Sequence, residues 1–228
     1  MTKEELPGYM EFVSMVDYPL DHGPNDLLVA AEETAIHTFG WPIGLVLHRD
    51  DAYPRPTEHG IESEIRTSFG TTGVRDGYDY WSLDSTGAYY ILKSLFEDSR
   101  SQTGKLFIDT RVVRTTELLL RTARLYERLG VPRSTTMHAR IEIGGLKDRT
   151  LDVASPKRIL MPGAYRSSVS KVSREYDETL DRVLSTEGLK EIVYDFVRRL
   201  GEMFNFFRVD KASLVDPTVD EFLRGRII

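Results

Sequence analysis

The chain has 228 residues, of which 40% are hydrophobic and 29% are charged, and it contains no cysteine. A chain of this length and composition can bury a core as one domain. The absence of cysteine excludes disulfides, thiolate zinc sites and cysteine nucleophiles. No stretch approaches the ~20 apolar residues that span a bilayer, and the amino terminus does not resemble a secretory signal. We therefore expect a cytoplasmic protein with no membrane partner.

The net charge of −6 conceals two blocks of opposite sign. Residues 1–64 hold three Lys or Arg against thirteen Asp or Glu, whereas residues 100–174 hold sixteen against six. Such asymmetry is typical of a polyanion-binding half, or of two surfaces that attract each other within or between chains. Charge blocks of this size also occur on ordinary solvated faces, so the pattern leaves these alternatives open.

Residues 1–40 predict a possible helical appendage. Asn25 or Asp26 can cap a helix that ends at Gly40. Its apolar face would be formed by Leu28, Ala31, Ala35 and Phe39. The apolar run from Ile43 to His48 then predicts a strand that is buried on both faces.

Alternation with a period of two dominates the next part of the chain. Residues 60–68 alternate apolar and charged side chains, which predicts a half-buried strand. Residues 78–83 and 88–95 flank the sequence Asp84-Ser85-Thr86-Gly87, which is typical of a β-hairpin turn. Residues 105–109 predict a further short strand.

The second half predicts a long helix, more strands and a helical tail. A helix is expected over 112–129, strands over 137–143 and 150–161, and a helix over 189–207. Residues 168–184 fit either a helix or an edge strand, and we favour the strand. Asp216 can cap a last helix with Pro217 at its first position. The chain therefore predicts an α+β fold, with a mainly antiparallel sheet, one long central helix and C-terminal helices packed on it, in a single domain spanning 1–228.

A group of basic residues forms the leading candidate site. On a helical wheel, Arg114, Arg121, Arg124 and Arg128 fall within about 80° of one another. Arg111 precedes them, and Arg140, Lys147 and Arg149 follow in the adjoining segments. One face holding these side chains would track phosphates or meet an acidic protein surface. Against this, Glu117 lies within the stripe and can pair with its arginines, as happens on solvated helices.

Residues 47–65 are dense in possible metal ligands. His48, Asp50, His59 and Glu62 could form the centre of a metal-dependent hydrolase. Their spacing matches no metal template, and on a strand His59 and Glu62 would point to opposite faces. We favour an extended acidic connection between two strands. Because the chain also lacks nucleophile and nucleotide-binding motifs, we expect no cofactor and lean towards a protein that is not an enzyme.

Aromatic residues gather on the predicted hairpin. They could offer stacking platforms for bases. Aromatics at strand spacing are more often one row facing the core and one row of cross-strand pairs, which is the interpretation we favour. The residues concerned are Tyr78, Tyr80, Trp81, Tyr89 and Tyr90.

Several segments carry a family resemblance: GWPIGLVLHRDDAYPRPTEHGIESEI, YDYWSL with YYILKSLFED, GKLFIDTRVVRTTELLLRTARLYERLGVP, GGLKDRTL and MFNFF. Together they resemble, over roughly residues 25–225, the region that follows the Schlafen-type AlbA_2 domain in many bacterial proteins. That domain, which is proposed to bind nucleic acid or nucleotide, has no room before the first expected helix, so no functional residue carries over. The resemblance implies a companion module, in proteins suspected of regulation or anti-phage defence.

These observations favour a non-enzymatic accessory or regulatory module that binds nucleic acid or an acidic protein surface through its arginine-rich face. The alternative is a protein-interaction module without a nucleic-acid role, in a homo-oligomer or larger complex where the acidic block of one chain meets the basic block of another. A metal-dependent hydrolase is the third hypothesis.

Overall fold

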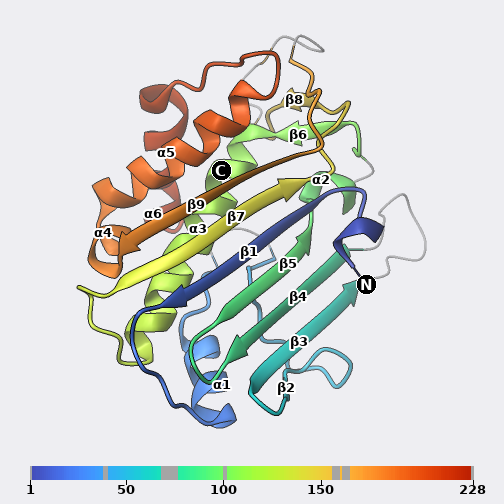
Figure 1. Ribbon diagram of the computed structural model, residues 1–228. Coiled ribbons are helices and arrows are strands. Elements are labelled where there is room, and N and C mark those ends of the chain that lie inside the picture. Colours follow the sequence, from blue (N-terminus) through green and yellow to red (C-terminus); the bar gives the residue numbers. More distant parts are fainter. Residues whose placement is uncertain are drawn as a thin grey trace.

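Strands of one antiparallel sheet organise the molecule (Figure 1). The computed structural model describes residues 2–37, 41–67, 77–99, 102–155, 160 and 165–226. Within them, seven strands pair in the order β2-β3-β4-β5-β1-β7-β9, and every pairing is antiparallel. Their bounds are β1 Tyr9–Val16, β2 Arg55–Pro56, β3 Gly60–Thr67, β4 Gly77–Asp84, β5 Tyr89–Ser94, β7 Thr136–Gly144 and β9 Lys171–Thr179. Two short strands, β6 (Lys105–Phe107) and β8 (Thr150–Asp152), form a separate parallel pair.

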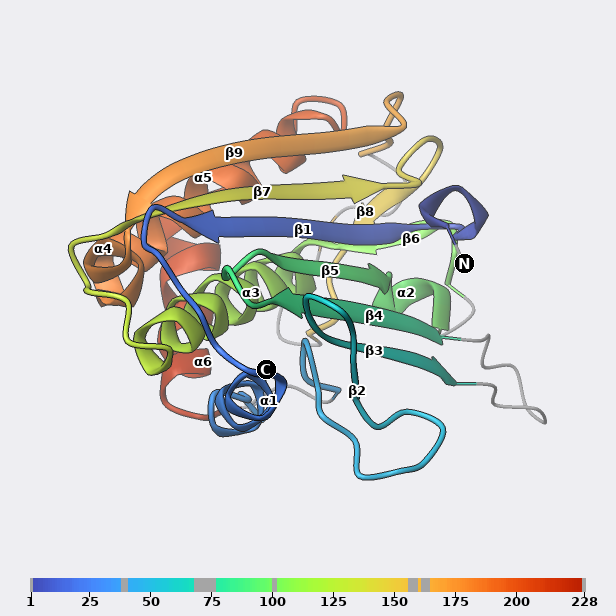
Figure 2. The same ribbon diagram turned by 60° about the horizontal axis from the view of Figure 1, so that its bottom comes forward.

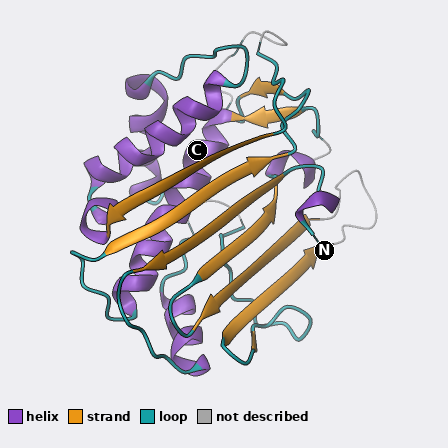
Figure 3. Cartoon of the chain, viewed as in Figure 1, coloured by secondary structure: helices purple, strands orange, loops and turns teal. Residues whose placement is uncertain are grey.

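The main helices lie on one side of this sheet (Figures 2 and 3). The longest, α3 (Ile108–Arg128), contacts α1, α4, α5 and α6 and is buried along most of its length. The other helical segments are η1 Lys3–Glu5, α1 Pro24–Glu33, α2 Phe96–Ser99, α4 Leu180–Leu184, α5 Thr186–Glu202, η2 Lys211–Val215 and α6 Asp216–Leu223. The predicted α+β class is confirmed, with its antiparallel sheet, long central helix and C-terminal helices.

The β4–β5 hairpin forms as the sequence predicts. Gly87 adopts a positive φ of 90° in the turn, and its N–H donates to the carbonyl of Asp84. A side chain there would collide with Leu20, at 2.6 Å from the Cβ position. The positive φ is what favours glycine here, because the Leu20 methyl group lies at the end of a flexible side chain that can move.

The expected helical appendage is wrong for residues 9–16, because they form β1 in the interior of the sheet. Its sequence YMEFVSMV places apolar side chains on both faces, with Glu11 and Ser14 interrupting the alternation. Helix α1 is also shorter than expected, since it ends at Glu33, and it buries Leu27, Ala30 and Ala31. The predicted positions Phe39 and Gly40 lie outside the described residues.

The apolar run after α1 is a buried loop and not the expected strand. Ile43 and Val46 are buried, yet the backbone here pairs with side chains. The N–H of Ile43 donates to Glu117, and the carbonyl of Gly44 accepts from Arg121. Because these partners come from α3, the segment cannot add to the sheet ladder.

The remaining elements differ from prediction mainly at their ends. Helix α3 begins at Ile108 and shortens the expected strand, and β8 ends at Asp152, while most of 156–161 lies outside the described residues. Residues 168–184, which fit either a helix or a strand, contain strand β9 followed by helix α4. Helix α5 stops at Glu202, because Asn205 and Phe206 adopt positive φ. Asp216 lies inside α6 and does not cap it.

Candidate binding surface on the open face of the sheet

Half of the eight predicted basic residues are buried beneath the sheet. Arg111 pairs with Glu97 at 3.1 Å, Arg114 with Glu117 at 2.6 Å, and all four side chains are at most 6% exposed. Removing one partner from such a pair leaves an uncompensated charge in the core, which costs about 3–5 kcal/mol. Arg111 and Arg114 therefore stabilise the fold through these pairs.

Arg149 has the most complete set of partners in this layer. Its guanidinium forms two parallel hydrogen bonds of 2.8 Å to the carboxylate of Asp98. It also donates to the carbonyls of Gly145, Lys105 and Pro7. All five N–H donors of the side chain are thus used, and they join α2, β6, the turn after β7 and the segment before β1.

Arg121 holds the loop after α1. It donates to the hydroxyl of Tyr89 and to the carbonyls of Ala31 and Gly44. The guanidinium also lies 5.5 Å from the centroid of the Tyr89 ring. Arg121 thus binds the chain's own backbone and is enclosed away from solvent.

A further ion pair links β4 and β5 on the same side. Lys93 donates to Asp79, which also accepts from the indole N–H of Trp41 at 3.2 Å. Burial lowers the pKa of Lys93, although the charge of Asp79 opposes this shift. Together with the arginine pairs, this contact extends the buried ionic layer along the sheet.

The predicted arginine face is therefore corrected, since four of its eight residues are buried: Arg111, Arg114, Arg121 and Arg149. Of the others, Arg128 pairs with Glu33 and Arg140 with Glu142, while Arg124 and Lys147 are exposed. The wheel correctly grouped the arginines, but it could not show that Arg114 and Arg121 face the protein while Arg124 and Arg128 reach solvent. The two charge blocks thus meet partly within one chain.

The structure does not bring the predicted metal ligands together. His48 lies 3.4 Å from Glu32, His59 lies 3.9 Å from Glu58, and Glu62 bonds Arg55 and Tyr80 on the sheet. Asp50 is exposed in the connecting loop. No group of three or more His, Asp or Glu side chains suited to a metal occurs in the part of the chain that the structure describes.

The opposite face of the sheet carries no α-helix among the described residues (Figure 2). Cross-strand register places apolar, aromatic and charged side chains together on it. Its strands present more carboxylates than cations. The carboxylates are Glu11, Glu62, Glu64, Asp84, Glu142, Glu175 and Asp177, and the Lys and Arg are Arg55, Arg66, Arg140 and Lys171.

A hollow of about 500 Å³ lies at one part of this face. Tyr78, Tyr80, Tyr90 and Leu92 contribute its aromatic and apolar lining. The rings of Tyr80 and Tyr90 lie 5.9 Å apart and are inclined at 59°. Burial raises the pKa of Tyr78 to about 12, with the charge of Glu64 acting in the same direction. These phenols are therefore neutral, and their rings form a wall of the hollow. We name this site the tyrosine hollow; its other lining residues are Thr2, Lys3, Glu4, Glu11 and Glu64.

Two buried carboxylates lie beside the tyrosine hollow and already hold a cation. Lys3 of η1 lies 2.9 Å from Glu11 and 3.5 Å from Glu142. Its ammonium is also 5.7 Å from the centroid of the Tyr9 ring. Tyr90 donates to Glu11 at 3.1 Å. This corner therefore combines aromatic rings and carboxylates around an ammonium group, which is the chemistry of cation recognition.

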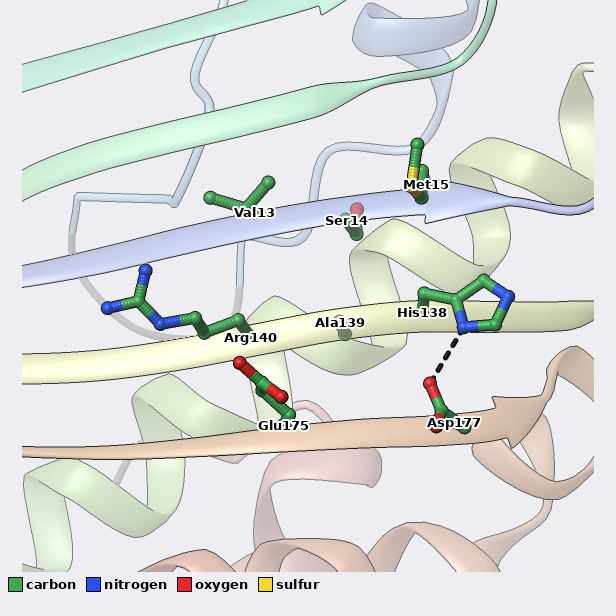
Figure 4. Close-up of a pocket in the computed structure, with 8 residues that line it drawn as sticks. All are labelled: Val13, Ser14, Met15, His138, Ala139, Arg140, Glu175 and Asp177. Carbon is green, nitrogen blue, oxygen red and sulfur yellow. Dashed lines mark hydrogen bonds and ion pairs between the residues drawn. The ribbon is translucent and has the colours of Figure 1, made fainter.

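A second hollow, of about 270 Å³, lies over β1, β7 and β9 (Figure 4). Val13 and Met15 form its apolar part and are 40% and 55% exposed. His138 lies between Asp177, at 2.7 Å from Nδ1, and Asp17, at 2.9 Å from Nε2. The hydrogen bonds that His138 donates to these two carboxylates raise its pKa. The imidazolium form is thus favoured at this end of the face.

Sequence reasoning found half of the aromatic arrangement. It anticipated two rows on the hairpin, and Trp81 and Tyr89 do face the core while Tyr78, Tyr80 and Tyr90 face outward. It missed Tyr9 and Glu11, because strand β1 was not predicted. The apolar side chains of β1 lie on both of its faces, so its sequence offered no clear alternation as a signal.

No family model, curated protein or solved structure matches this chain. In the described residues, no helix combines the length and the apolar composition needed to cross a membrane. The candidate surface therefore rests on its own geometry.

Proposed function

We propose that the protein is a binding module, not an enzyme, that receives a basic segment of a partner protein on the open face of its sheet. The observation that carries this proposal is the composition of that face: two hollows lined by apolar and tyrosine side chains, set among an excess of carboxylates. Exposed apolar surface with polar surroundings is characteristic of interaction sites, and the charge selects a cationic partner.

The buried arginines argue against the alternative of a phosphate-tracking face on α3. A polyanion must reach the cations that it neutralises. Four of the eight predicted residues are enclosed and bonded within the chain, and two more have carboxylate partners at the surface. The resemblance to regions that accompany AlbA_2 domains is consistent with a partner in regulation or anti-phage defence.

The experiment is a nuclear magnetic resonance titration at low ionic strength with three probes: an oligolysine peptide, an oligoglutamate peptide and a single-stranded DNA oligonucleotide. We expect the oligolysine peptide to shift amide signals of β1, β3, β4 and β5, whereas the oligoglutamate peptide and the oligonucleotide leave them unchanged. Binding of the oligonucleotide to α3, or oligolysine contacts confined to other surfaces, would overturn the proposal.

A further inference from the structure

We infer that the tyrosine hollow is a receptor for one lysine or arginine side chain of the partner segment, and that Lys3 is its internal competitor. This inference rests on the proposed function and specifies its anchor point. The main support for this inference is that the ammonium of Lys3 already occupies the edge of the site, where Glu11, Glu142 and the ring of Tyr9 hold it.

The lining of the hollow suits a long aliphatic stem that ends in a cation. Tyr80, Tyr90 and Leu92 offer apolar and aromatic surface for the methylene groups. Glu11, which is only 7% exposed, supplies the main carboxylate, and Glu64 supplies a second one that also pairs with Arg66 at 2.7 Å. A cation near aromatic faces gains more when its surroundings exclude water, and the buried position of Glu11 provides such surroundings.

The hydroxyl groups of the tyrosines are already engaged, which leaves their rings for contact. Tyr80 donates to Glu62 at 2.8 Å, and Tyr90 donates to Glu11 at 3.1 Å. These bonds fix the rings in place and leave negative charge beside them. The lining holds the carboxylates of Glu4, Glu11 and Glu64 against the single ammonium of Lys3, which disfavours phosphates and carboxylates as ligands.

The segment that carries Lys3 is held weakly. Helix η1 has three residues and buries none of them, and its cap is formed locally by Thr2 and Glu5. The pKa of Lys3 is raised, chiefly by its hydrogen bond to Glu11 and against the effect of burial. Displacing Lys3 breaks its contacts with Glu11, Glu142 and Tyr9, and an incoming lysine or arginine would restore the ion pairs.

The test uses the full chain and two pentapeptides, acetylated and amidated, in which lysine or arginine is flanked by glycines. Butylammonium ion and butanol serve as the small cation and the neutral control. Nuclear magnetic resonance signals of Tyr78, Tyr80 and Tyr90 report binding. We expect both peptides and the small cation to shift these signals, and butanol to leave them unchanged. Shifts with butanol alone, or with butylammonium but neither peptide, would refute the assignment.

Single substitutions separate the contributions of Lys3 and of the Tyr90 ring to peptide binding. We expect Lys3→Met to tighten peptide binding about two- to fivefold, since it removes the competing cation. Tyr90→Leu should weaken binding more than Tyr90→Phe, which keeps the ring. Tyr18→Leu, which changes an exposed tyrosine outside the hollow, is the matched control and should have no effect. Unchanged or weaker binding by Lys3→Met overturns the role of Lys3 as competitor, provided that thermal unfolding shows a folded variant.

The outcomes also distinguish this inference from the proposed function. If oligolysine binds the open face while the single-cation peptides leave the tyrosine signals unmoved, the receptor assignment is wrong and the binding face stands. If oligolysine fails to bind, both are wrong.

Discussion

The two faces of the sheet carry the same kinds of charged and aromatic residues, but these residues have different roles on each face. On the helix side, charged groups such as Arg149 and Asp98 are enclosed and paired at close range. On the open side, carboxylates share the surface with largely buried tyrosines and two hollows. An enclosed charge must find all its partners within the chain, whereas an open face can leave recognition to a ligand. Charge density alone therefore does not mark a binding surface, because only accessible charged groups can reach a ligand.

The largest expected effect lies in the buried layer. Replacing Arg149 with alanine leaves Asp98 buried without its cation, and we expect the free energy of unfolding to fall by about 3–5 kcal/mol. Denaturant unfolding of Arg149→Ala measures this loss. Lys147→Ala, at an exposed neighbouring position, is the control and should change stability by no more than about 0.5 kcal/mol. A similar loss of stability in both variants would show that buried Arg149 contributes no more to the fold than exposed Lys147.

A smaller effect is expected at Glu142, which is buried although it belongs to the open face. Burial raises its pKa, but the hydrogen bonds from Tyr9 and Lys171 and the charges of Lys3 and Arg140 outweigh this and hold the pKa below 4.5. We expect Glu142→Gln to cost about 1–3 kcal/mol at pH 7.

The sign of the pH dependence at Glu142 follows from its lowered pKa. The ionised carboxylate stabilises the fold above about pH 4.5, and this contribution is lost as the pH falls through the folded-state pKa. The difference in stability between the wild type and Glu142→Gln should therefore shrink in acid. A difference that stays constant between neutral and acidic pH would show that the ion pairs around Glu142 contribute nothing.

His138 gives a titration that is specific to the second hollow. Its folded-state pKa lies above 6.5, because Asp17 and Asp177 hold the imidazolium. The stabilisation is complete below pH 6.5 and is lost as the pH rises through the folded-state pKa. Proton nuclear magnetic resonance should show this raised value, and Asp17→Asn should lower it. A His138 pKa at or below 6.5 in the wild type would contradict the contact.

The smallest change in stability is expected at the exposed, C-terminal end of the arginine stripe on α3. Arg124 and Arg128 reach solvent, and Arg128 pairs with Glu33 where both side chains are about half exposed. The double variant Arg124→Ala with Arg128→Ala should lose no more than about 1 kcal/mol and should bind the oligolysine peptide as the wild type does. A marked loss of peptide binding would place the interface on α3.

Short-range patterns predicted much of the fold. The turn at Gly87, the alternation of β3 and β7 and the periodicity of α3 and α5 follow from local geometry, and these elements are present. The α+β class followed from the order of these elements. Strand β1 was not predicted, because an interior strand with apolar residues on both faces and a glutamate among them lacks a clear period.

The candidate surface could not be predicted because it depends on which side of each element is covered. The arginines of α3 form the same wheel whether they face solvent or Glu97 and Glu117. Likewise, Tyr9 and Tyr90 are 81 positions apart in number, and only the pairing of β1 with β5 places their strands side by side. Long-range contacts of this kind leave no trace in a local window.

The most direct test reverses the same charge on both sides of the molecule. Glu64→Lys with Glu175→Lys alters the open face, and Glu187→Lys with Glu191→Lys makes an equal change on the exposed part of α5. The measurement is the dissociation constant of a labelled oligolysine peptide for each folded variant. We expect the open-face variant to bind about tenfold more weakly and the α5 variant to bind with at most a small change. Equal weakening by both variants would mean that the peptide senses only net charge, and the open face would not be its site.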